Sequence, residues 1–424
     1  MSKRAVCLFF TLVFIIPVYA QENKELQDLF LEGEYFLMNE AYSDALTYYL
    51  QLYEKLPDNS NVAYCIGVCY LNIPGKKNLS IEYLENASKN MSAKHKEGTL
   101  TQISAPYDAL FELGRAYRIN YRFEKAKEAF TKYLTTLLPD DRENIDFVKN
   151  EIEVCNMAKD LIAKPVTYSE ENVGELFNDE KSNFNPLISA DGKSFAFMVS
   201  LKFYDAVMFS RLVNGKWIAP VNITPELQSD GDFYISCLST DGKLLFLSKD
   251  DHINSDIYMS SFDGRSWSKT IKLNKNINTK YWESHGFLPE DGSQLIFASD
   301  RPGGFGGLDL YVAHKVNGDW SPAVNLGPEI NTEFNEDRPF LINNGKTLFF
   351  SSQGHENIGG YDLFKSDLQS NGIWSNPKNL GYPINTPDDD IFFMPAVDGK
   401  SGYYSRFKES GGFGKEDIYK VTFK

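Results

Sequence analysis

The stretch that decides the fold is Phe297–Thr332, which reads FASDRPGGFGGLDLYVAHKVNGDWSPAVNLGPEINT. Short apolar runs bounded by Gly, Pro and Asn predict a strand, a glycine-rich loop, a second strand, a hairpin turn and a third strand. Five copies of this pattern, spaced by about fifty residues, fill the C-terminal part of the chain. A period of that length with several strands per copy is typical of a β-propeller.

Each copy contains the same parts in the same order. The first part is a turn of the Asp-Gly-Lys kind, which is a strong hairpin signal because both central positions need positive φ. These turns begin at Asp191, Asp241, Asp291, Asn344 and Asp398. An apolar strand follows, and then an aspartate before an apolar pair: Asp205, Asp256, Asp309, Asp362 and Asp417. Four copies continue to a tryptophan that we expect to pack in the core: Trp217, Trp267, Trp320 and Trp374.

The fifth copy stops at Lys424, before its tryptophan strand. The segment Asn172-Val173-Gly174 aligns without a gap to Asn325-Leu326-Gly327 of the third copy, and the residues after the two segments align as well. We therefore expect residues near 167–177 to pair as a strand in the blade formed by residues 388–424. Closure of this kind hides sheet edges. The sequence thus predicts five blades.

Residues 24–163 carry a helical pattern instead, with apolar positions at three- and four-residue spacing. Small residues alternate with aromatic ones in paired helices, as at Gly33, Ala45 and Tyr49, and again at Gly114, Ala126 and Phe130. These positions resemble the tetratricopeptide repeat, in three copies followed by a charged capping helix. The resemblance implies a concave surface that binds a peptide or protein. The alternative is that the stack is only a spacer.

The N-terminus has Lys3 and Arg4, an apolar run over Ala5–Val18, and small residues at the A-x-A-like site ending at Ala20. This order is typical of a secretory signal peptide and predicts an exported protein. The apolar run is shorter than the ~20 residues of a membrane-spanning helix. The expected organisation is therefore a signal peptide over 1–20, helical repeats with a capping helix over 21–163, and a propeller over 164–424.

The composition argues against several classes of function. A net charge of −15 opposes binding of nucleic acid or anionic lipid, which needs clustered Lys and Arg. Cys65, Cys69, Cys155 and Cys237 are too scattered for a disulfide framework, and we expect small buried cysteines. The five histidines show no metal-binding spacing, and the Gly303–Gly307 loop lacks a phosphate-binding ending. We therefore expect no enzyme activity, no cofactor and no metal.

The repeated turn, strand and Asp-apolar-Tyr elements resemble the WD40-like propeller repeats of the TolB type. Signal peptide, tetratricopeptide-like repeats and such a propeller, in this order, resemble periplasmic proteins of the type IX secretion and gliding apparatus. Those proteins often continue into an OmpA-like domain, a part that this chain does not show. The resemblance implies an outer-membrane-associated location in the periplasm and partners among cell-envelope proteins.

The sequence leaves two functions open. One is a non-enzymatic scaffold that binds cell-envelope proteins, and the other is a propeller that binds a glycan or peptidoglycan. Tyr and Arg are favoured interface anchors, so the groove candidates for partner binding are Tyr35, Tyr64, Tyr107 and Arg115. Loops that vary on a repeated scaffold are where recognition residues lie, and the propeller candidates are Asp300, Arg301, His355 and Arg406. The five repeated aspartates are expected to bond backbone N–H groups in their own turns rather than a cation.

Overall fold

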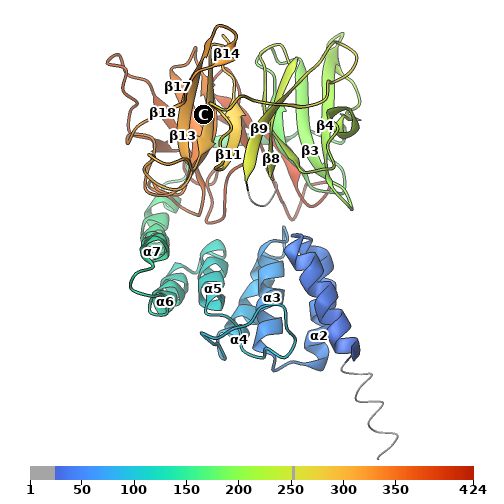
Figure 1. Cartoon of the computed structure of the whole chain (residues 1–424), viewed down its shortest axis with the longest axis vertical. Helices are drawn as coiled ribbons and strands as arrows, with labels where there is room; N and C mark the ends of the chain where they lie inside the picture. Colours follow the sequence, from blue (N-terminus) through green and yellow to red (C-terminus); the bar gives the residue numbers. More distant parts are fainter. Residues whose placement is uncertain (1–23, 251–253) are drawn as a thin grey trace, which may run out of the picture. The chain divides into compact units, whose positions relative to one another are not determined.

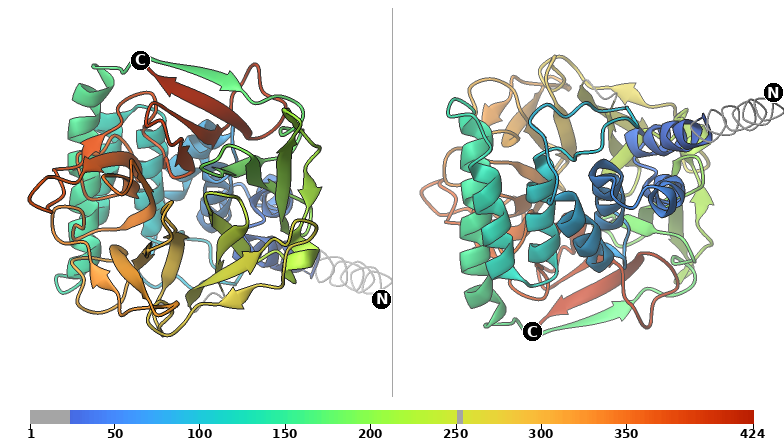
Figure 2. Two further views of the ribbon diagram at one scale, coloured as in Figure 1. Left: turned by 90° about the horizontal axis from the view of Figure 1, so that it is seen from above. Right: turned by 90° about the horizontal axis from the view of Figure 1, so that it is seen from below.

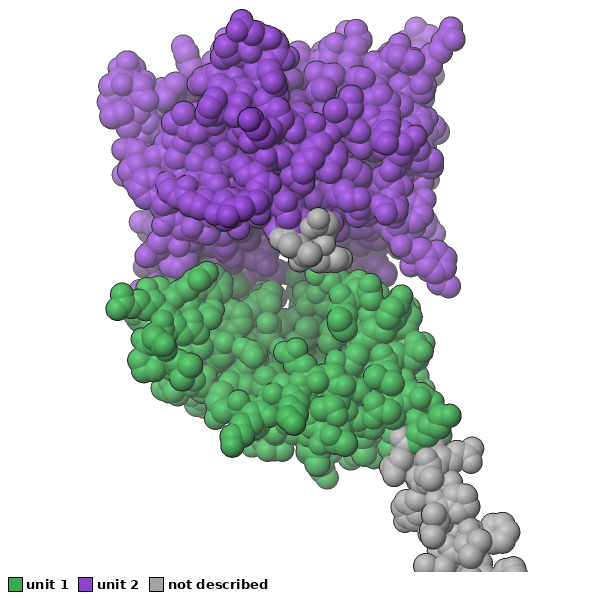
Figure 3. All heavy atoms as spheres, in the orientation of Figure 1, with its two compact units in different colours: residues 1–152 green, residues 153–424 purple. Residues whose placement is uncertain are grey.

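The computed structural model describes residues 24–250 and 254–424 (Figure 1). The expected signal peptide lies outside these residues, as does His252 in one of the variable loops. Two compact units divide between Ile152 and Glu153, and Figure 3 colours them separately. The first unit is helical, and the second contains the end of the last long helix and the strands. This order confirms the predicted fold class, a helical region followed by an all-β region.

The helical unit is a series of paired helices. Its elements are the helix over residues 24–38, α2 (Tyr42–Lys55), α3 (Ser60–Leu71), α4 (Ser80–Ala87), α5 (Asp108–Ile119), α6 (Phe123–Leu134) and α7 (Arg142–Ile162). The Asn59 side chain caps α3 by accepting a hydrogen bond from the Val62 N–H at 3.1 Å. A short 3-10 turn, Lys77–Leu79, leads into α4.

One glycine in each helix pair sets the close approach of its partner helix. A Cβ atom added to these glycines would lie only 3.0, 2.5 and 2.4 Å from the facing side chain. The three contacts are Gly33 with Tyr49, Gly67 with Leu84, and Gly114 with Phe130. Because any larger residue would push the helices apart, the small-and-large pattern seen in the sequence has a direct packing cause.

A buried ion pair joins the last helices of the unit. Nε of Arg118 in α5 lies 3.1 Å from a carboxylate oxygen of Glu151 in α7, and both side chains are almost fully buried. Since a charge in the interior needs a partner, removing either residue would take this contact from the other charge.

The β-region forms five antiparallel sheets arranged around a central axis (Figure 2, left). We number these blades in chain order. Blade 1 contains β2 (Asn183–Ile188), β3 (Ser194–Ser200), β4 (Asp205–Val213), β5 (Lys216–Trp217) and β6 (Val221–Asn222). After α8 (Thr224–Leu227), blade 2 contains β7 (Phe233–Leu238), β8 (Leu244–Asp250), β9 (Ser255–Ser261) and β10 (Ile271–Lys272).

The remaining blades repeat this order. Blade 3 contains β11 (Glu283–Phe287), β12 (Gln294–Ser299), β13 (Asp309–Val316), β14 (Asp319–Trp320) and β15 (Val324–Asn325). Blade 4 contains β16 (Glu336–Ile342), β17 (Thr347–Ser352), β18 (Asp362–Asp367) and β19 (Lys378–Asn379). Blade 5 contains β20 (Phe393–Pro395), β21 (Ser401–Arg406) and β22 (Asp417–Phe423), and is completed by β1 (Tyr168–Asn172).

The predicted closure of the ring is confirmed by the strand register. β1 pairs antiparallel with β22, from Tyr168 opposite Phe423 to Asn172 opposite Tyr419. Asn178 strengthens this junction, since its side chain accepts from the Ile418 N–H at 2.8 Å and donates to the Ile418 carbonyl at 3.0 Å. Asn331 makes the same two bonds to Leu310 within blade 3. The aligned asparagine therefore makes the same pair of hydrogen bonds at the closure of the ring as it makes inside blade 3.

The hairpin turns deviate from one expectation. Gly192, Gly242, Gly292, Gly345 and Gly399 all have positive φ, as predicted for the Asp-Gly turns. The preceding residue also has positive φ only at Asn344, at 54°. In the other four turns the aspartate keeps negative φ. Its side chain accepts from the backbone instead, as Asp191 does from the Lys193 N–H at 3.0 Å.

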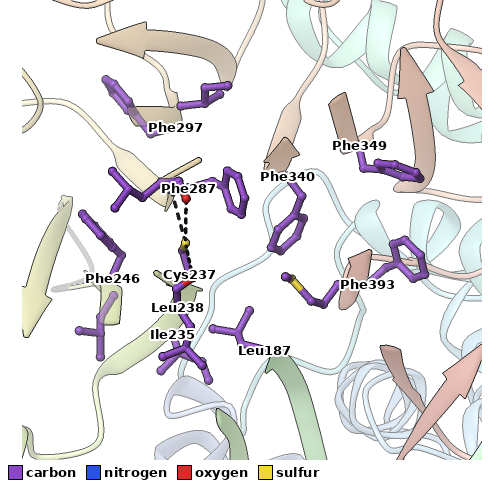
Figure 4. Packing of buried hydrophobic residues seen from close by; sticks show 14 of the residues in the cluster. Leu187, Ile235, Cys237, Leu238, Phe246, Phe287, Phe297, Phe340, Phe349 and Phe393 are labelled. Atoms are coloured by element: carbon purple, nitrogen blue, oxygen red, sulfur yellow. Dashed lines mark hydrogen bonds between the residues drawn. The ribbon is translucent and has the colours of Figure 1, made fainter. Parts of the chain in front are cut away.

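The inner and middle strands of the blades supply a core that extends through all five blades, and Phe195 and Phe197 belong to a second cluster beside it. Figure 4 shows phenylalanines of neighbouring blades meeting there, among them Phe246, Phe287, Phe340 and Phe393. Cys237 lies within this core and accepts a hydrogen bond from the Leu288 N–H at 3.4 Å.

The repeated tryptophans pack against apolar clusters, as predicted. Trp267 is only 4% exposed and its ring lies 5.0 Å from that of Phe209. Trp217 lies 5.8 Å from Phe177, while Trp320 and Trp374 are half-buried against the propeller core.

The cysteines are also as expected. All four that the structure describes are buried and form no disulfide, and burial raises the pKa of Cys69 and of Cys237 to about 12. Thiols held in the protonated form are poor nucleophiles and poor metal ligands.

Candidate functional site

The innermost strands of blades 1 to 4 are bulged at equivalent places, where the pairing with the next strand shifts register. Three residues at these bulges have positive φ, with Asn185 at 50°, His285 at 45° and Arg338 at 53°. Positive φ is uncommon for residues other than glycine. Because a bulge re-aims the local side chains, these positions differ from ordinary strand residues.

Side chains from four blades gather at this level of the axis. We call them the axial cluster, which consists of Tyr234, His285, Asp337, Arg338, Tyr361 and Phe392. All six keep partial solvent exposure. They lie at or near the start of the inner strands, or in loops at that end. The cluster therefore borders solvent at one mouth of the ring.

Asp337 is the most heavily bonded member of the cluster. Its carboxylate accepts from Nδ1 of His285 at 2.9 Å, from the Ser284 hydroxyl at 3.1 Å and from the Arg338 backbone N–H at 2.8 Å. Burial alone would raise the pKa of Asp337, but its interactions with His285 and Arg338 bring that pKa below the usual value. Burial and the Arg338 charge lower the pKa of His285, although Asp337 opposes them. The pair is therefore a carboxylate beside a neutral imidazole at neutral pH.

Arg338 differs from its neighbours because its guanidinium meets no hydrogen-bond acceptor among the described residues. Its Cζ lies 4.3 Å from the ring centroid of Phe392, which is a stacking contact. Phe392 in turn meets Phe184 of blade 1 edge-on, with the ring centroids 5.5 Å apart. Burial lowers the pKa of Arg338, while Asp337, Tyr361 and Tyr234 act in the opposite direction.

Two tyrosines complete the cluster. Tyr234 of blade 2 has its hydroxyl 3.5 Å from a carboxylate oxygen of Asp205. Burial raises the pKa of Tyr361 well above its usual value, and Asp337 and Asp389 raise it further. The Tyr361 phenol stays protonated at neutral pH. A tyrosine hydroxyl can donate a hydrogen bond, so both residues offer a donor. An imidazole held by a carboxylate is an arrangement used by general bases, but no described hydroxyl or thiol is hydrogen-bonded to Nε2 of His285. The cluster thus presents hydrogen-bond donors and aromatic rings at this mouth of the ring.

The opposite ends of the inner strands surround a second feature, a cavity of about 650 Å³. We call it the hairpin cavity because the Asp-Gly turns and the strand ends beside them form it. Its floor is apolar and includes Leu238, Phe287, Leu341 and Met394. Its rim is polar and includes Glu290, Asp291, Asn344, Asp398 and Lys420.

The rim carboxylates keep their charge at neutral pH. The Ser293 side chain and backbone N–H bond Asp291 and lower its pKa. Burial opposes ionisation of Asp398, but hydrogen bonds from Lys400 and Ser401 lower its pKa overall. With Glu290 also on this rim and exposed, the cavity mouth is mostly negative.

The repeated aspartates split into two groups. Asp309 accepts from the Phe305 N–H at 2.6 Å, and Asp362 and Asp417 make equivalent bonds at 2.7 and 2.6 Å. These three bond the backbone of their own loops, as predicted. Asp205 instead bonds the Ser200 hydroxyl, and Asp256 bonds Lys272. The sequences before Asp205 and Asp256 lack the glycine pair that precedes the other three aspartates.

The predicted propeller-loop residues make contacts inside the ring. Arg301 donates to the Ile277 carbonyl at 2.6 Å, and Arg406 donates to the Ile384 carbonyl at 3.0 Å. Nε2 of His355 lies 2.9 Å from the Ile330 carbonyl. The three isoleucines hold equivalent places in the loops that enter the next blade. Asp300 accepts from the Trp282 N–H at 2.7 Å. A role in recognition remains a prediction for these four residues.

The predicted groove residues are spread over the helical unit. Tyr35 is 62% exposed, and its ring meets Phe36 edge-on. Arg115 lies 2.9 Å from Glu112 of the same helix. Burial raises the pKa of Tyr64, and Glu112 contributes to that shift, so Tyr64 lies near this pair. Tyr107 is half-buried at the start of α5. Partner binding by these residues remains a prediction.

Neither a metal site nor a membrane span emerges from the part of the chain that the structure describes. It holds no group of three or more His, Cys, Asp and Glu side chains placed to bind a metal ion. None of its helices has the length and apolar character needed to cross a bilayer.

Sequence reasoning missed the axial cluster. The aligned prolines Pro186 and Pro339 were the available signal, because each follows a residue with positive φ in the inner strand. The residue before each proline, Asn185 in blade 1 and Arg338 in blade 4, marks the bulge.

The five sheets and the helix pairs define the class of protein: it is a five-bladed β-propeller preceded by a stack of helix pairs. No family profile and no curated protein matches the chain. Among solved structures, TolB from Acinetobacter baumannii is 17% identical with a TM-score of 0.37, and 57% of this chain and 55% of that one are covered. A putative TolB from Agrobacterium tumefaciens is 16% identical with a TM-score of 0.38, covering 61% of this chain and 98% of that one.

Propellers of another kind are similar to the same degree. An α-L-arabinofuranosidase from Lactobacillus brevis is 15% identical with a TM-score of 0.41, and the match covers 59% of this chain and 92% of that one. This chain spans just over half the length of the Acinetobacter TolB. Similarity at this level carries no conclusion about ligand, reaction or cellular location.

Proposed function

We propose that this protein is a non-enzymatic adaptor of the bacterial cell envelope, exported to the periplasm, and that its propeller binds a segment of a partner protein in the hairpin cavity. The observation that carries the proposal is the cavity itself, with about 650 Å³ of space above an apolar floor. Sites that bury a compact group are concave and mostly apolar, with a few polar groups that fix orientation.

The rim indicates which kind of segment fits. Glu290, Asp291 and Asp398 surround the mouth, and Lys420 is the cation among the lining residues. Complementary charge favours a partner segment that carries Lys or Arg on either side of an apolar anchor. The apolar anchor would cover Leu238 and Phe287 on the floor.

The helical unit gives the adaptor a second surface in this proposal. Tyr35 is largely exposed, and Tyr64, Tyr107 and Arg115 belong to the same series of helices. Together with the signal peptide expected from residues 1–20, this surface supports attachment to an outer-membrane assembly, such as a type IX secretion apparatus, through a partner protein.

The test is photo-crosslinking in intact cells that express the full chain. A photoreactive residue at Asn344, on the rim, should yield a defined protein adduct. Asn317 is the matched control, since both are exposed turn asparagines with φ near 54° and 53° but Asn317 lies outside the cavity lining. Replacing Glu290 and Asp291 with Gln and Asn should weaken the adduct at Asn344.

Two outcomes contradict the proposal. One is that the same protein adducts form at Asn344 and at Asn317, which would mean that the cavity does not bind a specific partner. The other is turnover of a glycan or peptide by the purified protein. Adducts to peptidoglycan rather than to protein would favour the alternative, a glycan-binding propeller held to a complex by its helices.

A further inference from the structure

Arg338 is a charged side chain on the propeller axis with unused hydrogen-bonding capacity. A guanidinium carries five N–H donors. None of them meets an acceptor in the described residues, where its close contact is the stacking on Phe392 at 4.3 Å. Arg301 and Arg406 contrast with it, since both donate to backbone carbonyls.

Arg338 keeps partial solvent exposure, so a ligand at this mouth of the ring can reach its donors. The backbone at Arg338 also has φ of 53°, a conformation that disfavours any side chain. Stacking on Phe392 covers one face of the guanidinium, but it leaves the planar edge with its donors available.

The carboxylate beside Arg338 does not use those donors. Asp337 already accepts from His285, from Ser284 and from the Arg338 backbone N–H. Tyr361 and Tyr234 also lie near the guanidinium.

We propose that the axial cluster binds a carboxylate group, with Arg338 as its two-pronged donor. A guanidinium edge matches the two oxygens of a carboxylate in one plane. Phosphate offers a similar edge but carries a second negative charge near neutral pH, and Asp337 and Asp205 lie close by. A monoanion suits this site better than a dianion.

This inference goes beyond the proposed function. The hairpin cavity begins at the ends of the inner strands, near Leu238 and Leu341, whereas the axial cluster lies at or near their starts. The two sites can be tested separately, because a substitution at Arg338 leaves the cavity rim unaltered.

The test is calorimetric titration of the purified full chain with acetate, glucuronate, N-acetylglycine and inorganic phosphate at low ionic strength. Glucuronate represents a sugar acid, and N-acetylglycine represents the end of a peptide chain. At least one carboxylate should bind, at concentrations up to about 10 mM, and more tightly than phosphate. The tighter of the two extended probes identifies the source of the group.

Arg338→Gly is the informative variant. Glycine adopts positive φ without strain, so the melting temperature should hold or rise while binding weakens at least tenfold. Arg338→Lys is the second variant, for use if the glycine variant folds poorly. It keeps the positive charge but loses the two parallel N–H donors of the guanidinium, so it should also weaken binding. Arg211→Gln is the matched control, since Arg211 also stacks on a phenylalanine, Phe262, at 5.2 Å. It should bind like the unchanged protein.

Asp337→Asn adds an opposite prediction. Removing that negative charge should tighten carboxylate binding severalfold, whereas a merely structural role for Arg338 predicts no gain. The proposal is overturned if no carboxylate binds, if Arg338→Gly binds as tightly as the unchanged protein, or if phosphate binds better than every carboxylate.

Discussion

Blades 3 and 4 bury the same acidic position in two different ways. Glu283 and Glu336 open the inner strands of their blades, and neither is exposed. Each accepts from the backbone and hydroxyl of a threonine four residues earlier, and from a serine hydroxyl on the next strand. Arg301 adds a guanidinium 3.2 Å from Glu283. Glu336 has no such cation among the described residues.

The cause lies in the space after the middle strand. Gly354 holds the place in blade 4 that Arg301 holds in blade 3. A Cβ atom there would lie 1.9 Å from the Thr332 hydroxyl. No side chain fits, so His355 reaches the carbonyl of the preceding loop and leaves Glu336 without a counter-ion. Burial then raises the pKa of Glu336 to about 7. Equivalent positions in two blades can thus have the same backbone structure and different electrostatic environments.

Breaking the ion pair of blade 3 should have the largest effect. Arg301→Met leaves Glu283 buried without its cation and frees the carbonyls of Asn276 and Ile277. Loss of one partner of a buried pair costs about 3–5 kcal/mol of unfolding free energy.

The measurement is urea unfolding at pH 7 followed by tryptophan fluorescence. All five tryptophans lie after residue 200, so the signal reports on the propeller. Arg211→Met is the control and should change stability by less than about 1 kcal/mol, because Arg211 is exposed. An equal loss of unfolding free energy in both variants would show that the Arg301–Glu283 pair stabilises the propeller no more than the exposed Arg211 does.

Glu336→Gln should change how stability depends on pH. The folded-state pKa of about 7 lies above the ordinary value of 4.5. The folded state therefore holds a proton that the unfolded chain releases between these values. The resulting stability is present below about pH 4.5 and lost as pH rises through about 7, up to roughly 3 kcal/mol in all.

The glutamine variant should lack this loss, and unfolding midpoints from pH 4.5 to 8 measure it. The variant should therefore gain on the unchanged protein as pH rises. Parallel pH profiles for the two proteins would contradict the assignment of a raised pKa to Glu336.

His355→Ala should have the smallest effect. It removes the contact of Nε2 with the Ile330 carbonyl and the ring contact with Phe364, whose centroid lies 5.2 Å away. One neutral hydrogen bond contributes about 1 kcal/mol, so a loss of roughly 1–2 kcal/mol is expected by the same urea method. A loss as large as that of Arg301→Met would remove the contrast between the blades.

The fold was largely predictable because its signals are local and repeated. Asp-Gly turns mark hairpins, the aligned asparagines at Asn172 and Asn325 mark the closure, and Gly33 and Gly114 mark close helix contacts. The turn and glycine signals need only their own neighbours in sequence, and the closure signal comes from comparing one copy of the repeat with another.

The axial cluster was not predictable for the opposite reason. His285 and Arg338 lie at bulges of their strands, and they meet residues from other blades. Arg301 and His355 were chosen as variable loop residues, but their carbonyl partners lie 24 and 25 positions earlier in the chain. No local pattern encodes which loop a long side chain will reach.

The closing strand also decides when this protein can finish folding. Asn178 and Ile418, which hold β1 to β22, lie 240 positions apart. During synthesis, β1 leaves the ribosome long before its partner strand β22. Contacts between such distant residues form late and slowly. Until then both ends of the incomplete ring expose strand edges that invite pairing with other chains. A truncated or paused chain should therefore depend on chaperones more than the finished protein does.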